Sequence, residues 1–164
     1  MNFNLKKLTA ICLACFSTSV YAQSINVDDV IDNYIVYIQD VNSNELFYPD
    51  VQKRNITIDG KQIEQDVTYY SLGDDQIFSI IIQTYDDPEV KTTYYFKENE
   101  VIAVFIEESN FSSRNTDKKF RNYFLKEGNI ILEEPQNSAL DYQFFIDLGA
   151  TLAKNYLLQN TNSK

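Results

Sequence analysis

Apolar residues between positions 24 and 41 recur at the spacing of one helix face. The stripe consists of Val27, Val30, Ile31, Tyr34, Ile35, Ile38 and Val41. Asp28, Asp29 and Asp32 lie near its start, where the positive end of the helix dipole stabilises negative charge. The pattern predicts a helix over residues 24–41 that ends at Asn42-Ser43-Asn44.

From residue 55 to residue 133 the chain shows short apolar segments separated by turn residues. The predicted strands are residues 55–58, a segment from Lys61 onward, and residues 66–72, 76–85, 90–97, 101–109, 118–126 and 130–133. Asp59-Gly60 suits a two-residue hairpin, because both turn positions require positive φ angles. Short links join antiparallel neighbours, so the segment is interpreted as a meander of about six strands.

A second helical pattern follows Pro135. Ser138-Ala139-Leu140-Asp141 resembles a capping box with Asp in place of Glu, and the helix is predicted to reach about Gln159. Its stripe contains Tyr142, Phe145, Ile146, Gly149, Ala153 and Tyr156. The small residues in this stripe would let the helix approach a sheet closely, and the polar tail 160–164 is expected to fray. The fold class is therefore predicted as α+β: an N-terminal helix, an antiparallel meander, and a C-terminal helix packed on the sheet.

The central strands are apolar on both faces. Both alternating sets of residues 101–106 are apolar, and residues 77–82 are similar apart from Ser79. A sheet with one solvated face alternates more cleanly, so both faces are expected to be covered. The two helices could cover one face together or one face each. In the first case the other face must curl on itself or meet a partner, and partial closure of a twisted sheet is the preferred interpretation.

The N-terminus has the features of a secretory signal peptide. Lys6 and Lys7 precede a mostly apolar run at residues 8–20, and Val20-Tyr21-Ala22 offers small residues for cleavage. The apolar run is too short for a membrane span. We expect a signal peptide over residues 1–22, a single domain over residues 23–159, and export to the periplasm of a Gram-negative bacterium.

Both cysteines lie within this predicted signal peptide. Cleavage would leave no thiol for disulfides or nucleophilic chemistry. A lipid anchor at Cys15, within Leu13-Ala14-Cys15, is an alternative. It is less favoured because Cys12 stands where an aliphatic residue is expected.

The chain is strongly acidic. Its 164 residues include 14 basic and 24 acidic side chains, a net charge of −10, and loss of Lys6 and Lys7 with the signal would make it −12. Nucleic acid is disfavoured as a partner, because phosphate binding requires a basic surface. An acidic surface favours a cationic partner, and solubility alone explains it equally well. The chain has no His, the usual general base near neutral pH and the most common metal ligand.

Familiar catalytic motifs are missing from the sequence. There is no Gly-x-Ser-x-Gly, Ser-x-x-Lys, His-Glu-x-x-His or Gly-rich phosphate loop, so neither a cofactor nor a metal is predicted. Residues 55–66 partly match an EF-hand loop, but Gln62 at its eighth position and the lack of a preceding helix favour a hairpin. Paired carboxylates remain an alternative, since glycan cleavage needs two suitably spaced acids. Adjacent acids such as Glu107 and Glu108 point to opposite faces of a strand, so adjacency alone does not indicate a site.

Successive turns of a meander alternate between the two ends of the sheet. The turns at residues 73–75, 98–100 and 127–129 should therefore share one end, with Lys97 and Lys126 partly offsetting their acids. Tyr95 and Tyr123 lie on nearby strands, and tyrosine gives large contact area at interfaces. The candidate partner-binding residues are Asp74, Asp75, Glu98, Glu100, Glu127, Tyr95 and Tyr123. Ordinary polar turns and tyrosine packing within the sheet are the alternative explanation.

These features favour an exported, non-enzymatic protein of the inhibitor or immunity type, which recognises a basic protein through its surface. The alternatives are a carboxylate-dependent hydrolase of cell-wall glycan and an envelope module that binds an apolar molecule in the concavity of its sheet. Export, small size and many tyrosines favour the first of these three hypotheses.

Overall fold

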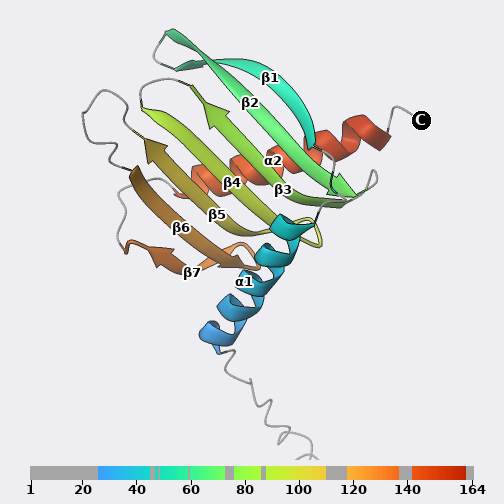
Figure 1. Cartoon of the computed structure of the whole chain (residues 1–164), viewed down its shortest axis with the longest axis vertical. Helices are drawn as coiled ribbons and strands as arrows, with labels where there is room; N and C mark the ends of the chain where they lie inside the picture. The colour runs from blue at the N-terminus through green and yellow to red at the C-terminus, as the bar shows by residue number, and fades with distance from the viewer. Residues whose placement is uncertain are drawn as a thin grey trace, which may run out of the picture.

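The computed structural model describes residues 26–44, 47, 49–58, 60–72, 76–85, 88–109, 118–136 and 142–161. The predicted fold class is confirmed: a helix, an antiparallel meander and a second helix follow one another along the chain (Figure 1). The elements are α1 (Val27–Ser43), β1 (Pro49–Ile58), β2 (Lys61–Leu72), β3 (Gln76–Thr84), β4 (Glu89–Lys97), β5 (Glu100–Ser109), β6 (Lys118–Lys126), β7 (Asn129–Glu134) and α2 (Tyr142–Thr161).

The sheet has seven strands in the order of the chain, β1-β2-β3-β4-β5-β6-β7. Residues 61–72 form one continuous strand, and β1 begins at Pro49, earlier than the predicted residue 55. Residues 49–54 lack a clear apolar alternation, and their strand geometry comes from pairing with β2 in the register Pro49↔Tyr70 to Ile58↔Lys61. The pair Ile58↔Lys61 leaves two residues between β1 and β2, which confirms the predicted two-residue hairpin. Strands flank this turn, so the EF-hand alternative is not supported.

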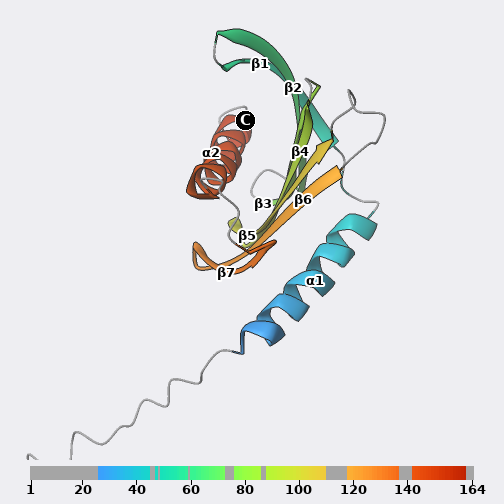
Figure 2. The same ribbon diagram turned by 90° about the vertical axis from the view of Figure 1, so that its left-hand side faces the viewer.

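The two helices lie on opposite faces of the sheet (Figure 2). The preferred expectation, in which one face closes on itself, was wrong. Ile38 and Val41 of α1 pack with Tyr95, Ala103 and Phe124 on one face. Two hydrogen bonds fasten this helix: the Tyr37 hydroxyl donates to the Phe96 carbonyl at 2.7 Å, and the Tyr95 hydroxyl donates to Asn42 Oδ1 at 3.1 Å.

The start of α1 follows from its cap. Asn26 is the N-cap residue, and its Oδ1 accepts a hydrogen bond from the Asp28 N–H at 3.2 Å. The helix begins at Val27, a few residues after the predicted start, and ends at Ser43. Its acidic first turn, Asp28 and Asp29, is where the sequence pattern placed it.

Helix α2 lies on the other face, toward which the β1–β2 hairpin curls (Figure 2). The predicted stripe is buried at Ile146, Gly149, Ala153 and Tyr156, and Leu152 joins it. A Cβ atom at Gly149 would overlap the ring of Tyr94 on β4. The absence of a side chain at Gly149 therefore sets how closely α2 approaches the sheet.

Some sequence-based predictions concern residues outside this description. The signal peptide 1–22, the possible anchor Cys15 and the capping box 138–141 lie outside the described residues. Helix α2 extends to Thr161, so its ordered part passes the predicted end at Gln159. Among the described helices, none is long and apolar enough to span a membrane.

The variant Gly149→Ala tests the close approach of α2. Alanine is the better helix former by about 1 kcal/mol, so helix propensity alone would make this variant more stable. Overlap with the Tyr94 ring should dominate and lower the free energy of unfolding by about 1–3 kcal/mol, measured by urea denaturation. The exposed neighbour Ala150→Gly should lose about 1 kcal/mol through propensity alone. A Gly149→Ala protein more stable than wild type would contradict this packing.

Candidate functional site

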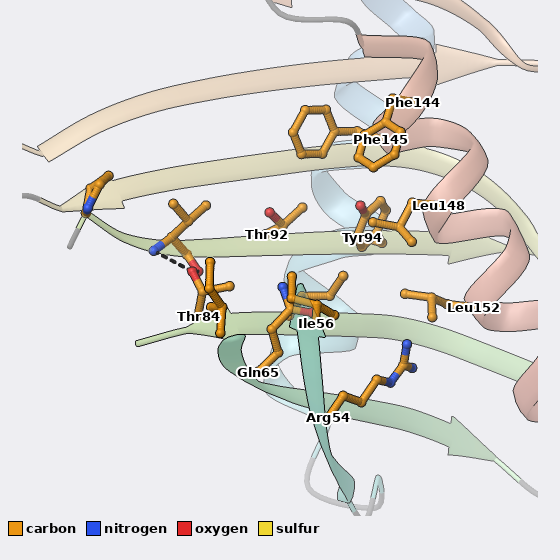
Figure 3. Close-up of a pocket in the computed structure, with 14 residues that line it drawn as sticks. Arg54, Ile56, Gln65, Thr84, Thr92, Tyr94, Phe144, Phe145, Leu148 and Leu152 are labelled. Carbon is orange, nitrogen blue, oxygen red and sulfur yellow. Dashed lines mark hydrogen bonds between the residues drawn. The ribbon is translucent and has the colours of Figure 1, made fainter. Parts of the chain in front are cut away.

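A cavity of about 480 Å³ lies between α2 and strands β1 to β4 (Figure 3). Most of its lining is aliphatic or aromatic. The lining residues are Arg54, Ile56, Ile63, Gln65, Ile82, Thr84, Pro88, Val90, Thr92, Tyr94, Phe144, Phe145, Leu148 and Leu152. Phe144, which is 60% exposed, marks the side of the cavity that is open to solvent.

Strand pairing explains how distant residues meet in this cavity. Arg54 pairs with Gln65, and Gln65 pairs with Thr84, so these side chains form one row across the face that α2 covers. Ile56 and Ile63 are paired farther along the β1–β2 hairpin. Because the hairpin curls toward α2, the row that begins at Arg54 and the pair Ile56–Ile63 form one wall of the cavity. Phe145 and Leu148 of α2 form the opposite wall (Figures 2 and 3). The cavity is therefore the space between the curled hairpin and the first half of α2.

Tyr94 lies in the floor of the cavity, which it lines together with Phe145 and Leu148 of α2 (Figure 3). Its side chain is fully buried, and its hydroxyl has no hydrogen-bond partner within the described part of the chain. Burial raises the pKa of Tyr94 far above its ordinary value, because the phenolate would be poorly solvated there. By contrast, the Thr84 hydroxyl is satisfied: it donates to the Val90 carbonyl at 3.0 Å and accepts from the Val90 N–H at 3.1 Å.

Arg54 provides positive charge at the wall of the cavity. Its guanidinium extends from β1 toward α2 (Figure 3) and donates a short hydrogen bond to the Tyr69 hydroxyl. Tyr69 is buried and stacks on Tyr156 of α2, with ring centroids 4.2 Å apart. Burial raises the pKa of Tyr69, and the nearby Arg54 partly counteracts that rise. Arg54 is therefore held in place through a tyrosine that is itself fixed by packing.

The predicted acidic turns can be placed in part. The strand order brings the β4–β5 turn, with Glu98 beside Glu100, and the β6–β7 turn, with Glu127, to the same end of the sheet. All three side chains are exposed. Tyr34 of α1 lies near them: burial raises its pKa, and the charges of Glu100 and Glu127 raise it further. Asp74 and Asp75 lie outside the described residues.

The two tyrosines predicted beside these acids are buried. Tyr95 is 6% exposed and packs beneath α1, whereas Tyr123 is 1% exposed and faces α2. They lie on opposite faces of the sheet, and neither offers an accessible surface beside the acidic turns. Packing within the core, the alternative to partner binding given above, explains why tyrosines occur at these two strand positions.

Two of the acidic turn residues have unusual backbone geometry. Glu98 and Glu127 have positive φ angles of 54° and 52°, a conformation that glutamate rarely adopts. Asn99 and Gly128, which share these turns, suit such angles better. Each turn therefore carries an exposed carboxylate at a position where Gly or Asn would be less strained.

The adjacent acids Glu107 and Glu108 do not form a shared site. Glu107 pairs with Lys118, whereas Glu108 lies 3.9 Å from both Lys119 and Arg121, and the two glutamates point to opposite faces of β5. In the part of the chain that the structure describes, no group of three or more acids and thiols has the geometry to hold a metal ion.

Comparison with known proteins gives no relative. No protein-family model, curated protein or solved structure matches this chain.

The sequence pattern missed the cavity residues Arg54 and Tyr94. Arg54 lies in the part of β1 that was not predicted as a strand, so its face of the sheet was not assigned. Tyr94 and Tyr95 are adjacent in the predicted strand 90–97, so strand alternation places them on opposite faces of the sheet. That alternation was the available signal, but it does not show which of the two hydroxyls lacks a partner.

Replacing Tyr94 by Phe tests the unpaired hydroxyl. The change removes a desolvated polar group without altering the packing volume, so Tyr94→Phe should raise the free energy of unfolding by about 1 kcal/mol. The neighbouring Tyr95→Phe is the matched control. It loses the hydrogen bond to Asn42 and should lower the free energy of unfolding by about 1 kcal/mol.

Tyr94→Phe should also differ from the wild type in alkaline solution. Because burial raises the pKa of Tyr94 above 10.0, the unfolded chain releases this proton at lower pH than the folded protein. This contribution to stability is complete below pH 10 and declines as the pH rises above it. Tyr94→Phe should therefore make the decline above about pH 10 shallower in urea titrations. An unchanged decline would contradict the burial of this hydroxyl.

Proposed function

We propose that this protein is a non-enzymatic binding module that holds an apolar small molecule between α2 and the curled β1–β2 hairpin. The observation that supports this proposal most strongly is the cavity of about 480 Å³, whose walls are mainly apolar. Sites for small molecules typically have volumes of about 300–1,000 Å³, apolar linings and a few polar groups that orient the ligand. Arg54 and the unpaired Tyr94 hydroxyl are such groups here.

Packing considerations support this proposal. Protein interiors are close-packed, and few voids larger than a water molecule are left in a domain. Here α2 packs tightly at Gly149, yet the preceding residue Leu148 and Phe145, one turn earlier, face the cavity. A tightly packed helix beside a wide apolar gap is the arrangement expected where a ligand completes the core.

We further propose that the protein acts in the periplasm, on the basis of the N-terminal signal pattern.

A neutral fluorescent probe, N-phenyl-1-naphthylamine, tests this function. The probe should bind the purified protein with increased fluorescence, because the cavity is apolar. The variant Ile56→Trp should fill the cavity from β1 and reduce binding at least about tenfold, the equivalent of about 1.4 kcal/mol.

Asn55→Trp is the matched control. Asn55 is the preceding residue of β1, is exposed and points to the opposite face of the hairpin. This variant should bind the probe as the wild type does. Absence of probe binding, or equal binding by the two tryptophan variants, would count against the proposed site.

A second candidate function is capture of a cationic protein by the acidic turns. The observation that favours it is the gathering of Glu98, Glu100 and Glu127 at one end of the sheet, two of them in strained backbone conformations. Such strain is often found at functional sites. An inhibitor or immunity-type role would use this end, because an acidic surface attracts a basic partner over long range.

The double variant Glu98→Asn/Glu127→Asn tests the second candidate. Asn suits positive φ, so the variant should fold at least as stably as the wild type while carrying two fewer negative charges. In a pull-down from bacterial extract it should lose a basic protein that the wild type retains at low salt. Glu64→Gln/Glu134→Gln removes the same charge at the other end of the sheet and should retain that protein. Equal retention by both double variants would contradict this candidate.

A further inference from the structure

We infer that the molecule bound in the cavity is an amphiphile with one anionic head group. The oxygens of this head group, a carboxylate or a phosphate, pair with Arg54, and the apolar tail lies along Ile56, Ile63 and Leu148. This inference rests on the proposed binding function and names the chemistry of the ligand.

The first argument is the charge of the cavity wall. The chain has 24 acidic and 14 basic side chains, so a random stretch of its surface is expected to contain more acids than bases. Among the described residues that line the cavity, Arg54 is charged and no aspartate or glutamate is present. The cavity is therefore an electropositive, apolar region in an acidic protein, and its charge complements an anion.

The second argument is that Arg54 lacks a carboxylate partner. Its neighbour Lys53, on the opposite face of β1, lies 3.1 Å from Glu64 and 3.5 Å from Asp66. Arg121 likewise lies within 4 Å of a carboxylate, at 3.9 Å from Glu108. Within the described parts of the chain, Arg54 forms no such ion pair and bonds instead to the neutral Tyr69 hydroxyl. A half-buried guanidinium is stabilised when an anion neutralises it.

The third argument is that Arg54 has unused donors in a fixed position. A guanidinium carries five N–H donors in a planar fork that matches the oxygens of carboxylate and phosphate groups. One donor is occupied by Tyr69, whose ring is fixed against Tyr156 of α2. In the view of Figure 3 the guanidinium lies on the Leu152 side of the cavity, and the lining residues Ile56, Leu148 and Phe145 lie farther from it. A head group at Arg54 would therefore leave its tail in the apolar part of the cavity.

Three ten-carbon probes separate the charge from the tail: decanol, decanoate and decyl phosphate. Each is titrated as a competitor of N-phenyl-1-naphthylamine on the wild type, Arg54→Gln, Arg54→Lys and Lys53→Gln. Decanoate or decyl phosphate should bind the wild type at least about tenfold more tightly than decanol, as expected for a charge-assisted hydrogen bond. The tighter of the two anions identifies the head group as a carboxylate or a phosphate.

Arg54→Gln should remove this preference, because it weakens the binding of the two anions far more than the binding of decanol. Displacement of the fluorophore by decanol in this variant shows that the cavity is intact. Arg54→Lys should restore part of the preference, because it keeps the charge without the planar fork. Lys53→Gln removes the same charge from the opposite face, so it controls for the net charge and should change anion binding less than about twofold.

The outcomes distinguish the inference from the function on which it rests. If decanol binds as tightly as the anions, or if Arg54→Gln and Lys53→Gln have equal effects, the anionic head group is wrong and the binding function stands. If the fluorophore binds but none of the three probes displaces it, the inference fails and the binding function stands. If the fluorophore itself does not bind, the proposed function fails and the inference fails with it.

Discussion

The close contact between Gly149 and Tyr94 is the constraint on which the rest of the structure depends. It lets α2 approach the sheet closely at one point, over the β3–β5 strands of the core. Beyond that point the β1–β2 hairpin curls out of the plane of the central strands, toward the face that α2 covers (Figure 2). The cavity is the space that remains between the hairpin and the helix. A larger residue at position 149 would push the helix outward and change the geometry of the floor, the wall and the mouth together.

The neighbouring residues Tyr94 and Tyr95 show how the two faces of the sheet differ. Strand alternation directs them to opposite faces, where each is covered by a helix. The Tyr95 hydroxyl donates to Asn42 of α1, so this polar group is satisfied in the core. The Tyr94 hydroxyl is buried beneath α2 without a partner in the described structure. The α2 face therefore holds a buried hydroxyl without a partner beside a cavity of about 480 Å³, whereas the cavity beside α1 has a volume of about 150 Å³.

Charge is distributed unevenly over the same framework. Three described acids lie in exposed turns at one end of the sheet, whereas the described lining of the cavity contains a cation and no acid. An acidic surface repels anions at long range, so Arg54 acts on them only at short range within the apolar cavity, where charge interactions are less screened. The acidic turns and the cavity thus favour ligands of opposite charge and are independent candidates for binding.

Local periodicity was enough to predict the two helices, most of the strands, the hairpin at Asp59-Gly60 and the small-residue stripe around Gly149, because each depends on residues close together in the chain. It also predicted that both sheet faces are covered. Tertiary structure decided which helix covers which face, how early β1 begins, and that Tyr95 and Tyr123 are buried rather than exposed beside the acidic turns. It also decided that Arg54 of β1, Tyr94 of β4 and Leu148 of α2 meet around one cavity. These features depend on strand register, sheet curvature and helix placement, which arise from contacts between residues far apart in the chain and leave no periodic signal in it.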